Sequence, residues 1–117
     1  NLFQNVKGSY AFMVFNPPYV PTKEIKWSDT DGGKMGREII DAFLDQFHLF
    51  LDEKGTCYLL QSSRNSLILT QEKAREVGFE CNIVALHDVP GEELQVLKLS
   101  RKEKEEEGEE YFNAQNY

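Results

Sequence analysis

The sequence lacks a long hydrophobic run, an excess of positive charge and a cysteine motif of the metal-binding kind. Its longest apolar stretches, such as 11–15 and 57–60, are far shorter than the roughly 20 residues that cross a bilayer, so we expect no membrane-spanning segment. The 13 Lys and Arg residues are outnumbered by 20 Asp and Glu, which gives a net charge of −7. A chain of this charge repels polyanions, and a general binder of nucleic-acid backbones is therefore unexpected.

Cysteine is scarce, and the two that occur have no metal-ligand spacing. Cys57 and Cys81 lie inside apolar runs, which predicts buried free thiols, no metal site and a reducing compartment. We therefore expect a cytoplasmic location, with a nuclear one also open. The first nine residues show neither an initiator Met nor the layout of a signal peptide, which predicts that the chain is part of a longer protein.

What is present is a sufficient core, since 40% of the 117 residues are hydrophobic and 12% are aromatic. The hydrophobic pattern predicts strands over 10–15, 56–61, 79–86 and 94–99, and helices over 34–51 and 65–77, the second ended by Gly78. Residues 17–33 form a predicted irregular loop, and 52–55 and 87–93 form predicted turns. Residues 101–117 are acidic and rich in Asn and Gln, and we expect a disordered tail there, separate from a folded part over 1–100.

Alternation of strands and helices predicts an α/β fold. The run 10–15 does not alternate with polar residues, which is typical of a strand buried on both faces of a parallel sheet. We therefore expect three layers, with 10–15 parallel to 56–61. The last two strands are expected to form an antiparallel hairpin, so that one strand opposes the rest.

The motif Asn16-Pro17-Pro18-Tyr19 follows the first strand and carries the predicted chemistry. It places a side-chain amide at the carboxyl edge of a sheet, where open α/β folds bind ligands. The prolines restrict the backbone and hold Asn16 in one pose. The Asn16 side-chain oxygen and the Pro17 carbonyl can both accept from one planar NH₂ group while the Tyr19 ring stacks on it, which suits N-methylation of an amide or of a base amine. As a bare tetrapeptide the motif is also compatible with a simple turn.

In its context this motif resembles the HemK-like glutamine methyltransferases, in particular the eukaryotic and archaeal branch that modifies class-1 translation release factors. The resemblance covers residues 10–100. The residues that carry it are Val14 to Val20, then Trp27, Gly32, Gly33, Gly36, Arg37, Glu38 and Asp41, then Gly91, Glu93, Leu94, Val96, Leu97 and Lys98. The first segment is shared with adenine-N6 and cytosine-N4 methyltransferases, whereas the glycine-rich helix start is more specific to this branch.

The resemblance implies roles for individual residues. Asn16 binds the target amide and lies against S-adenosylmethionine, Pro17 supplies the second acceptor, and Tyr19 packs on the amide. Pro18 and Val20 shape the slot. Residues 28–31 separate Trp27 from Gly32 more widely than is typical, and the loop over 21–33 is shorter than usual, which leaves the loop geometry open.

The glycine-rich turn that holds the cofactor in such enzymes does not precede Tyr10. The resemblance therefore implies the C-terminal half of a class I, Rossmann-like methyltransferase, from its fourth strand onward, with a mostly parallel sheet that ends in the hairpin. This chain alone is expected to be incomplete and inactive.

Three functions remain open: methylation of a glutamine, expected in the Gly-Gly-Gln loop of a release factor; adenine-N6 methylation of nucleic acid, which the acidic charge disfavours; and a non-catalytic fragment. The family also implies a small zinc-binding activator subunit as a partner. We expect no catalytic role for His48 or His87, and we interpret Arg37 and Glu38 as exposed helical charges.

Overall fold

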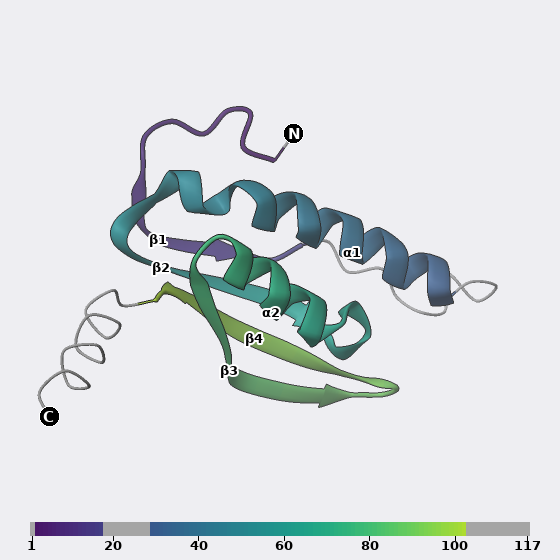
Figure 1. The fold of residues 1–117 in the computed structure, drawn as a ribbon. Helices are drawn as coiled ribbons and strands as arrows, with labels where there is room; N and C mark the ends of the chain where they lie inside the picture. Colours follow the sequence, from purple (N-terminus) through teal and green to yellow (C-terminus); the bar gives the residue numbers. More distant parts are fainter. Residues whose placement is uncertain (1, 18–28, 103–117) are drawn as a thin grey trace, which may run out of the picture.

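The computed structural model describes residues 2–17 and 29–102 (Figure 1). The elements are β1 (Tyr10–Phe15), α1 (Asp29–Gln46), the 3₁₀ turn η2 (Phe47–Phe50), β2 (Leu51–Ser62), the 3₁₀ turn η3 (Ser63–Asn65), α2 (Leu67–Glu76), β3 (Phe79–Val89) and β4 (Glu92–Arg101). Among these residues no helix is long and apolar enough to cross a membrane.

The four strands form one sheet in the order β1-β2-β4-β3. Strand β1 is parallel to β2, and β4 is antiparallel to both of its neighbours, β2 and β3. Three strands therefore run in one direction and β4 runs against them. This confirms the predicted α/β sheet that ends in an antiparallel hairpin.

The core lies between this sheet and the two helices, which pack side by side on one of its faces (Figure 1). The apolar side of α1 and η2 meets the sheet through fully buried side chains. The core comprises Ile40, Phe43, Leu44, Phe47, Leu51, Cys57, Leu59, Ala74, Phe79, Cys81, Leu97 and Leu99. The hydrophobic periodicity of residues 34–51 is the feature that brings the first four of these to one face.

The expected third layer is wrong for the part of the chain that the structure describes. Met13 and Phe15 pack toward α1, whereas Phe12 and Val14 face away from the helices and are 61% and 55% exposed. An uninterrupted apolar run supplies hydrophobic side chains to both faces of a strand, but it does not determine that both faces are covered. Strand β1 is buried on one face only, at the edge of the sheet.

Two predicted boundaries are also wrong. Helix α1 begins at Asp29, five residues before the predicted start, and continues through Gly32 and Gly33. Glycine disfavours a helix by only about 1 kcal/mol relative to alanine, which is too little to end one that tertiary packing supports. The predicted turn over 52–55 lies inside β2, as an irregularity between the pairs Tyr10↔Leu51 and Phe12↔Thr56.

Gly78 ends the second helix as predicted, whereas the hairpin turn around Gly91 differs from the prediction. Gly78 has a φ of 87° and its N–H donates to the Arg75 carbonyl, so that it ends α2 in the left-handed conformation. The hairpin turn is tighter than the predicted 87–93, because β3 pairs with β4 as far as Val89↔Glu92. Only Pro90 and Gly91 remain between the strands, and Gly91 has a φ of 83°.

Arg101 is the last residue of β4 rather than the first of a solvated tail. Its guanidinium lies 4.9 Å from the centre of the Phe79 ring and donates to four backbone carbonyls of η2 and β2, those of His48, Leu51, Asp52 and Glu53. It therefore fixes the connection between α1 and β2. Residues 103–117 lie outside the described residues, so the disordered tail predicted there stays a prediction.

We expect the isolated 117-residue chain to self-associate through the uncovered face of β1, because Phe12 and Val14 present adjacent apolar side chains at a sheet edge. Sedimentation velocity over a range of chain concentrations measures this. A Phe12→Ser, Val14→Thr double variant should shift the distribution toward monomer. A monodisperse wild-type monomer that melts cooperatively would contradict the expectation.

Candidate functional site

The described part of the predicted site is Asn16 and Pro17. They directly follow the last residue of β1, where Asn16 is exposed and Pro17 is half-buried. The other predicted site residues, Pro18, Tyr19 and Val20, lie outside the described residues, as does Trp27. Their assignments stay predictions. The structure thus places the amide of Asn16 beyond the carboxyl end of a parallel strand, where the sequence predicted it.

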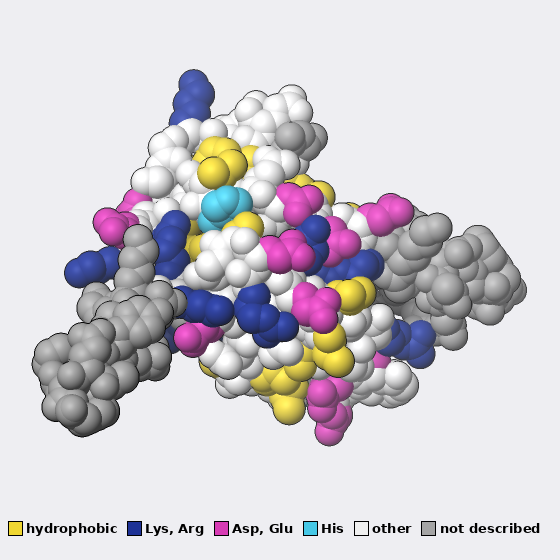
Figure 2. Space-filling model, in the orientation of Figure 1, with side chains coloured by type: hydrophobic (Ala, Val, Ile, Leu, Met, Phe, Trp, Pro, Cys, Tyr) yellow, Lys and Arg dark blue, Asp and Glu magenta, His cyan; other side chains and the backbone are white. Residues whose placement is uncertain are grey.

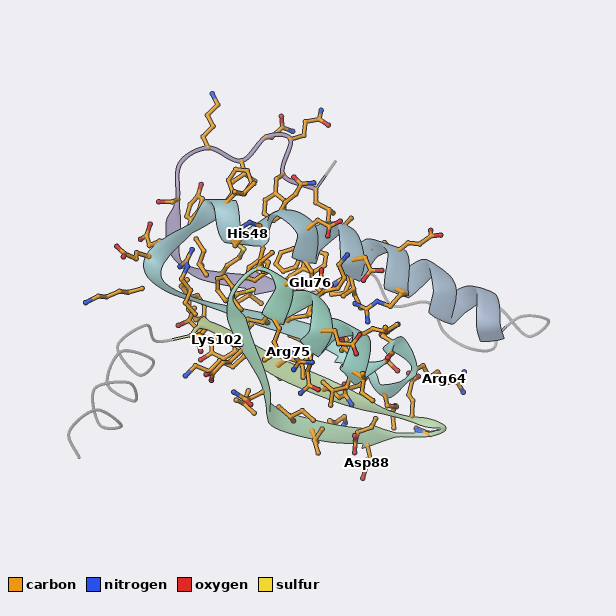
Figure 3. All side chains as sticks on the ribbon, in the orientation of Figure 1. His48, Arg64, Arg75, Glu76, Asp88 and Lys102 are labelled. Carbon is orange, nitrogen blue, oxygen red and sulfur yellow. The ribbon has the colours of Figure 1, made fainter. Side chains whose placement is uncertain are left out.

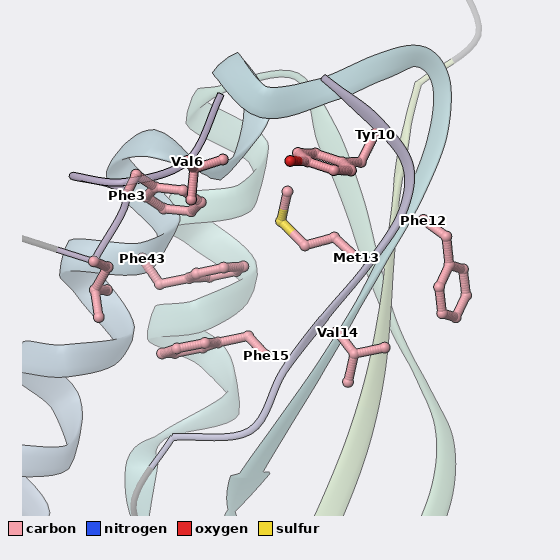
Figure 4. A pocket seen from close by; sticks show the side chains of 9 residues that line it. Phe3, Val6, Tyr10, Phe12, Met13, Val14, Phe15 and Phe43 are labelled. Atoms are coloured by element: carbon pink, nitrogen blue, oxygen red, sulfur yellow. The ribbon is translucent and has the colours of Figure 1, made fainter. Parts of the chain in front are cut away.

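The strand end next to Asn16 is supported by stacked aromatic rings (Figure 4). The ring of Phe15 lies on that of Phe43 of α1, with centroids 4.2 Å apart and planes at 2° to one another. Phe43 also contacts Phe3 and Phe47, at 5.6 and 5.4 Å. Because Phe15 immediately precedes Asn16, these contacts restrict the direction in which the Asn16 backbone leaves the sheet.

A cavity of about 340 Å³ lies between β1 and the N-terminal segment (Figure 4). Its walls come from apolar side chains such as Phe3, Val6 and Met13. The Tyr10 hydroxyl donates to the Lys7 carbonyl at 2.9 Å. A cavity with this lining offers little to orient a charged or strongly polar group. We therefore assign the candidate site to the carboxyl edge and not to this cavity.

A chain of polar side chains runs under α2 beside the carboxyl edge. Arg37 donates to the Thr70 hydroxyl at 2.9 Å, Thr70 donates to Gln61 Oε1 at 2.7 Å, and Gln61 Nε2 donates to Gln95 Oε1 at 3.1 Å. Thr70, Gln61 and Gln95 are all buried, and each donor in the series meets an acceptor. The interpretation of Arg37 as an exposed charge is wrong, since its side chain is only 13% exposed. Glu38 is exposed, as expected.

Sequence reasoning did not identify Gln61, Thr70 or Gln95. The available signal was weak: Gln61 and Gln95 occupy the same alternating, buried positions as the apolar residues of their strands. Their mutual pairing depends on the β2–β4 register, in which Gln61 lies opposite Gln95. Spacing along the chain does not give that register.

His48 is the second residue of η2, in the connection between α1 and β2 (Figure 3). Burial, with a further contribution from the Arg101 guanidinium, lowers the pKa of His48 from its ordinary value of 6.5. His48 lies near the start of β1 and β2, at the edge of the sheet opposite the one that carries Asn16, so we assign it no part in the candidate site. Within residues 2–17 and 29–102, no group of three His, Cys, Asp or Glu side chains could hold a metal ion.

The cysteines are free and buried, as predicted. Burial raises the pKa of Cys57 to about 12 and that of Cys81 to about 11, so that neither thiol is a nucleophile near neutral pH. We expect both to react with a disulfide reagent at pH 8 at least ~100-fold more slowly in the folded chain than in urea. Mass spectrometry after timed labelling measures each rate. Fast labelling of either thiol in the folded chain would contradict the burial.

The outer surface of the molecule on the side of the two helices carries both signs of charge (Figure 2). Among its described residues, Lys and Arg are interspersed with Asp and Glu, and they do not form a continuous basic band. One ion pair, Lys73 to Asp45 at 2.9 Å, links α2 to α1 on this face. Such a surface gives no preference for a nucleic-acid backbone.

Comparison with known proteins finds similar chains among methyltransferases. A protein of Methanocaldococcus jannaschii named as a protein N5-glutamine methyltransferase is 40% identical, with 86% of this chain and 54% of that protein covered. The mouse methyltransferase HEMK2 is 28% identical over 86% of this chain and 50% of its own length. No protein-family model matches the chain.

A solved structure has the same fold. It is the Encephalitozoon cuniculi Mtq2–Trm112 complex, described as responsible for methylation of the translation termination factor eRF1. The match has a TM-score of 0.57 and 30% identity, and covers 78% of this chain and 51% of that one. The chain thus spans about half the length of the relatives it matches.

Proposed function

We infer a methyl-transfer function from the premise that this chain is a relative of the HemK-like glutamine methyltransferases, as the sequence resemblance predicted. We propose that it forms the substrate-binding half of an S-adenosylmethionine-dependent N-methyltransferase that acts on a glutamine side-chain amide in a protein. The observation that carries the proposal is the exposed Asn16-Pro17 pair at the carboxyl end of β1.

The proposed role of Asn16 is to accept a hydrogen bond from the target NH₂ group through Oδ1, with the Pro17 carbonyl as the second acceptor. A neutral amide accepts without taking a proton, so the nitrogen keeps both of its hydrogens until the bond to carbon forms. Holding both N–H groups turns the nitrogen lone pair toward the methyl donor. Tyr19 is proposed to stack on the amide plane, and Pro18 and Val20 to shape the slot around it.

S-adenosylmethionine, when bound, supplies the methyl group from its sulfonium. The described residues are compatible with this cofactor at one position. Asn16 is exposed beyond the end of a parallel strand, and its neutral amide, unlike a carboxylate, places no negative charge beside the sulfonium. We propose that Asn16 contacts both the cofactor and the target. As the nitrogen–carbon bond forms, the methyl–sulfur bond of the donor breaks and one N–H proton of the amide passes to water, because Asn16 and the Pro17 carbonyl accept hydrogen bonds without taking a proton.

For the substrate we propose a class-1 release factor, methylated in its Gly-Gly-Gln loop. The similarity to the Mtq2–Trm112 complex supports this, since that complex is described as acting on eRF1. It also supports a small activator subunit, for which we propose a zinc-binding protein. A release-factor substrate is consistent with the proposed cytoplasmic location, and a nuclear pool remains part of the proposal.

The test is transfer of radiolabelled methyl by the complete natural protein that carries this chain, with its activator. The acceptors are a Gly-Gly-Gln release factor, the same factor with the target glutamine replaced by asparagine, and adenine-containing DNA. We expect label only on the intact release factor. Labelling of DNA alone would favour adenine methylation, and labelling of none of the three acceptors would favour a non-catalytic chain.

A further inference from the structure

The side chain of Arg37 joins the middle of α1 to the turn that follows β2. Its Nη1 donates to the carbonyl oxygens of Asn65 at 2.6 Å and Ser66 at 3.0 Å, in addition to the Thr70 hydroxyl. These carbonyls belong to the turn between η3 and α2, where Ser66 has a positive φ of 69°. One guanidinium nitrogen therefore contacts two carbonyls of the turn and one hydroxyl of α2.

Asp41 holds the guanidinium in this orientation. Arg37 Nε donates to Asp41 Oδ1 at 2.9 Å, and Nη2 lies 2.9 Å from the same oxygen, without the angle that a hydrogen bond needs. Asp41 is one helical turn after Arg37, so α1 itself carries both members of the pair. The planar guanidinium is thus directed from two sides, which a lysine ammonium cannot reproduce.

Gly36 allows the two segments to approach this closely. A Cβ at position 36 would lie 2.7 Å from Nδ2 of Asn65. The Asn65 side chain is itself fixed, because its Oδ1 accepts from the Ser62 N–H at 2.8 Å. Gly36, Arg37 and Asp41 are residues that carried the family resemblance, and they serve this one contact. We call these three residues, with Asn65, Ser66 and Thr70, the α1 clamp.

The clamp acts at the edge of the sheet that bears Asn16. Strands β1 and β2 are parallel, with Phe15 opposite Leu59, so the turn after β2 lies beyond the same carboxyl edge. Further along α1, Phe43 stacks on Phe15 at 4.2 Å. The clamp holds one part of the helix to the turn after β2, while another part of it presses on the residue before Asn16.

We propose that Arg37 is a positioning residue for Asn16, acting through α1 and the Phe43–Phe15 stack. The inference rests on the proposed function, since it assigns Arg37 a role in that reaction. Without the clamp, α1 can shift along the sheet and the strand end loses its fixed direction. A misplacement of about 1 Å in such a site lowers the rate of the chemical step by up to ~100-fold.

The experiment compares Arg37→Ala and Arg37→Lys with two controls in the complete protein. Lys73→Met removes a second polar link between the helices, Lys73 Nζ to Asp45 Oδ1 at 2.9 Å, which lies near the C-terminal end of α1. Ile40→Val removes one methyl group from the core at a site that is 1% exposed. We expect both Arg37 variants to lose at least ~10-fold in kcat while KM for S-adenosylmethionine stays within ~2-fold, and both controls to keep kcat within ~2-fold.

The inference is overturned if Arg37→Ala keeps kcat within ~2-fold of wild type. It is also overturned if Ile40→Val, at the same free energy of unfolding as Arg37→Ala, loses as much in kcat. If the wild-type protein transfers no methyl group, the proposed function fails. The positioning of Asn16 by Arg37 is then tested separately, through the NMR chemical shifts of the Asn16 side-chain amide. A shift of these signals in Arg37→Lys that is absent in Lys73→Met supports positioning. Unchanged Asn16 signals overturn it.

Discussion

An Asn16→Ala variant of the complete protein will fold as the wild type does and lose methyl transfer to the release factor by about 100-fold or more. Asn16 is exposed and follows the last residue of β1, so its side chain contributes little to the core. Removal of the acceptor leaves the target amide free to rotate. If Asn16 were only a turn residue, its loss would change stability by about 1 kcal/mol or less and leave the rate unchanged.

Two further variants separate orientation from charge and from stacking. Asn16→Asp keeps the shape but adds a negative charge beside the sulfonium, and it should not restore turnover. Tyr19→Phe should be mild because the ring remains, whereas Tyr19→Ala should weaken binding of the substrate. The measurement is kcat and KM for each variant with the release factor. Near-normal turnover by Asn16→Ala would defeat the assignment for a glutamine and an adenine target alike.

The second large effect is on folding. Phe47→Ala should destabilise the fold by about 3–5 kcal/mol, because it leaves a ring-sized cavity in the buried core. Phe47 is 0% exposed and contacts Phe43 and Phe79, with ring centroids 5.4 and 4.7 Å away. Small domains have a total free energy of unfolding of about 5–15 kcal/mol, so this one substitution removes much of it.

Leu49→Ala is the matched control for Phe47→Ala, because both residues lie in η2 while Leu49 is 66% exposed. Its cost should stay below about 1 kcal/mol. Urea unfolding followed by circular dichroism, at concentrations where the chain is monomeric, measures both variants. Equal losses for the two would mean that η2 does not pack as the structure places it.

The strands and the apolar face of α1 were predictable because their signals are local. Periodicity alone placed Ile40, Phe43 and Phe47 on one side of a helix, and the turn glycines Gly78 and Gly91 marked element ends. The extent of β2 was not predictable in the same way. Its residues 52–55 have the composition of a turn, and they stay in the strand because the chain bulges between two pairs with β1.

For the candidate site too, the residue with a local signal was predictable and the residue with long-range contacts was not. Asn16 follows directly from the sequence, because a strand that ends in Asn-Pro-Pro has few ways to direct that amide. Arg37 did not, since a charge on an amphipathic helix is usually solvated. Its burial depends on carbonyls of Asn65 and Ser66, which are distant along the chain and become neighbours only when α1 and α2 pack together. Backbone acceptors carry no residue type that a sequence pattern could reveal.

The sheet order has a consequence for synthesis. Strand β4 is the last of the four to be translated, yet it lies between β2 and β3. While the chain emerges from the ribosome, β2 and β3 therefore have no hydrogen-bonded contact with one another, and only the β1–β2 pair can form. A nascent chain stopped before residue 92 retains both helices but leaves β3 without any strand partner. A premature stop codon within β4 would therefore leave β3 unpaired and reduce these four strands to the β1–β2 pair.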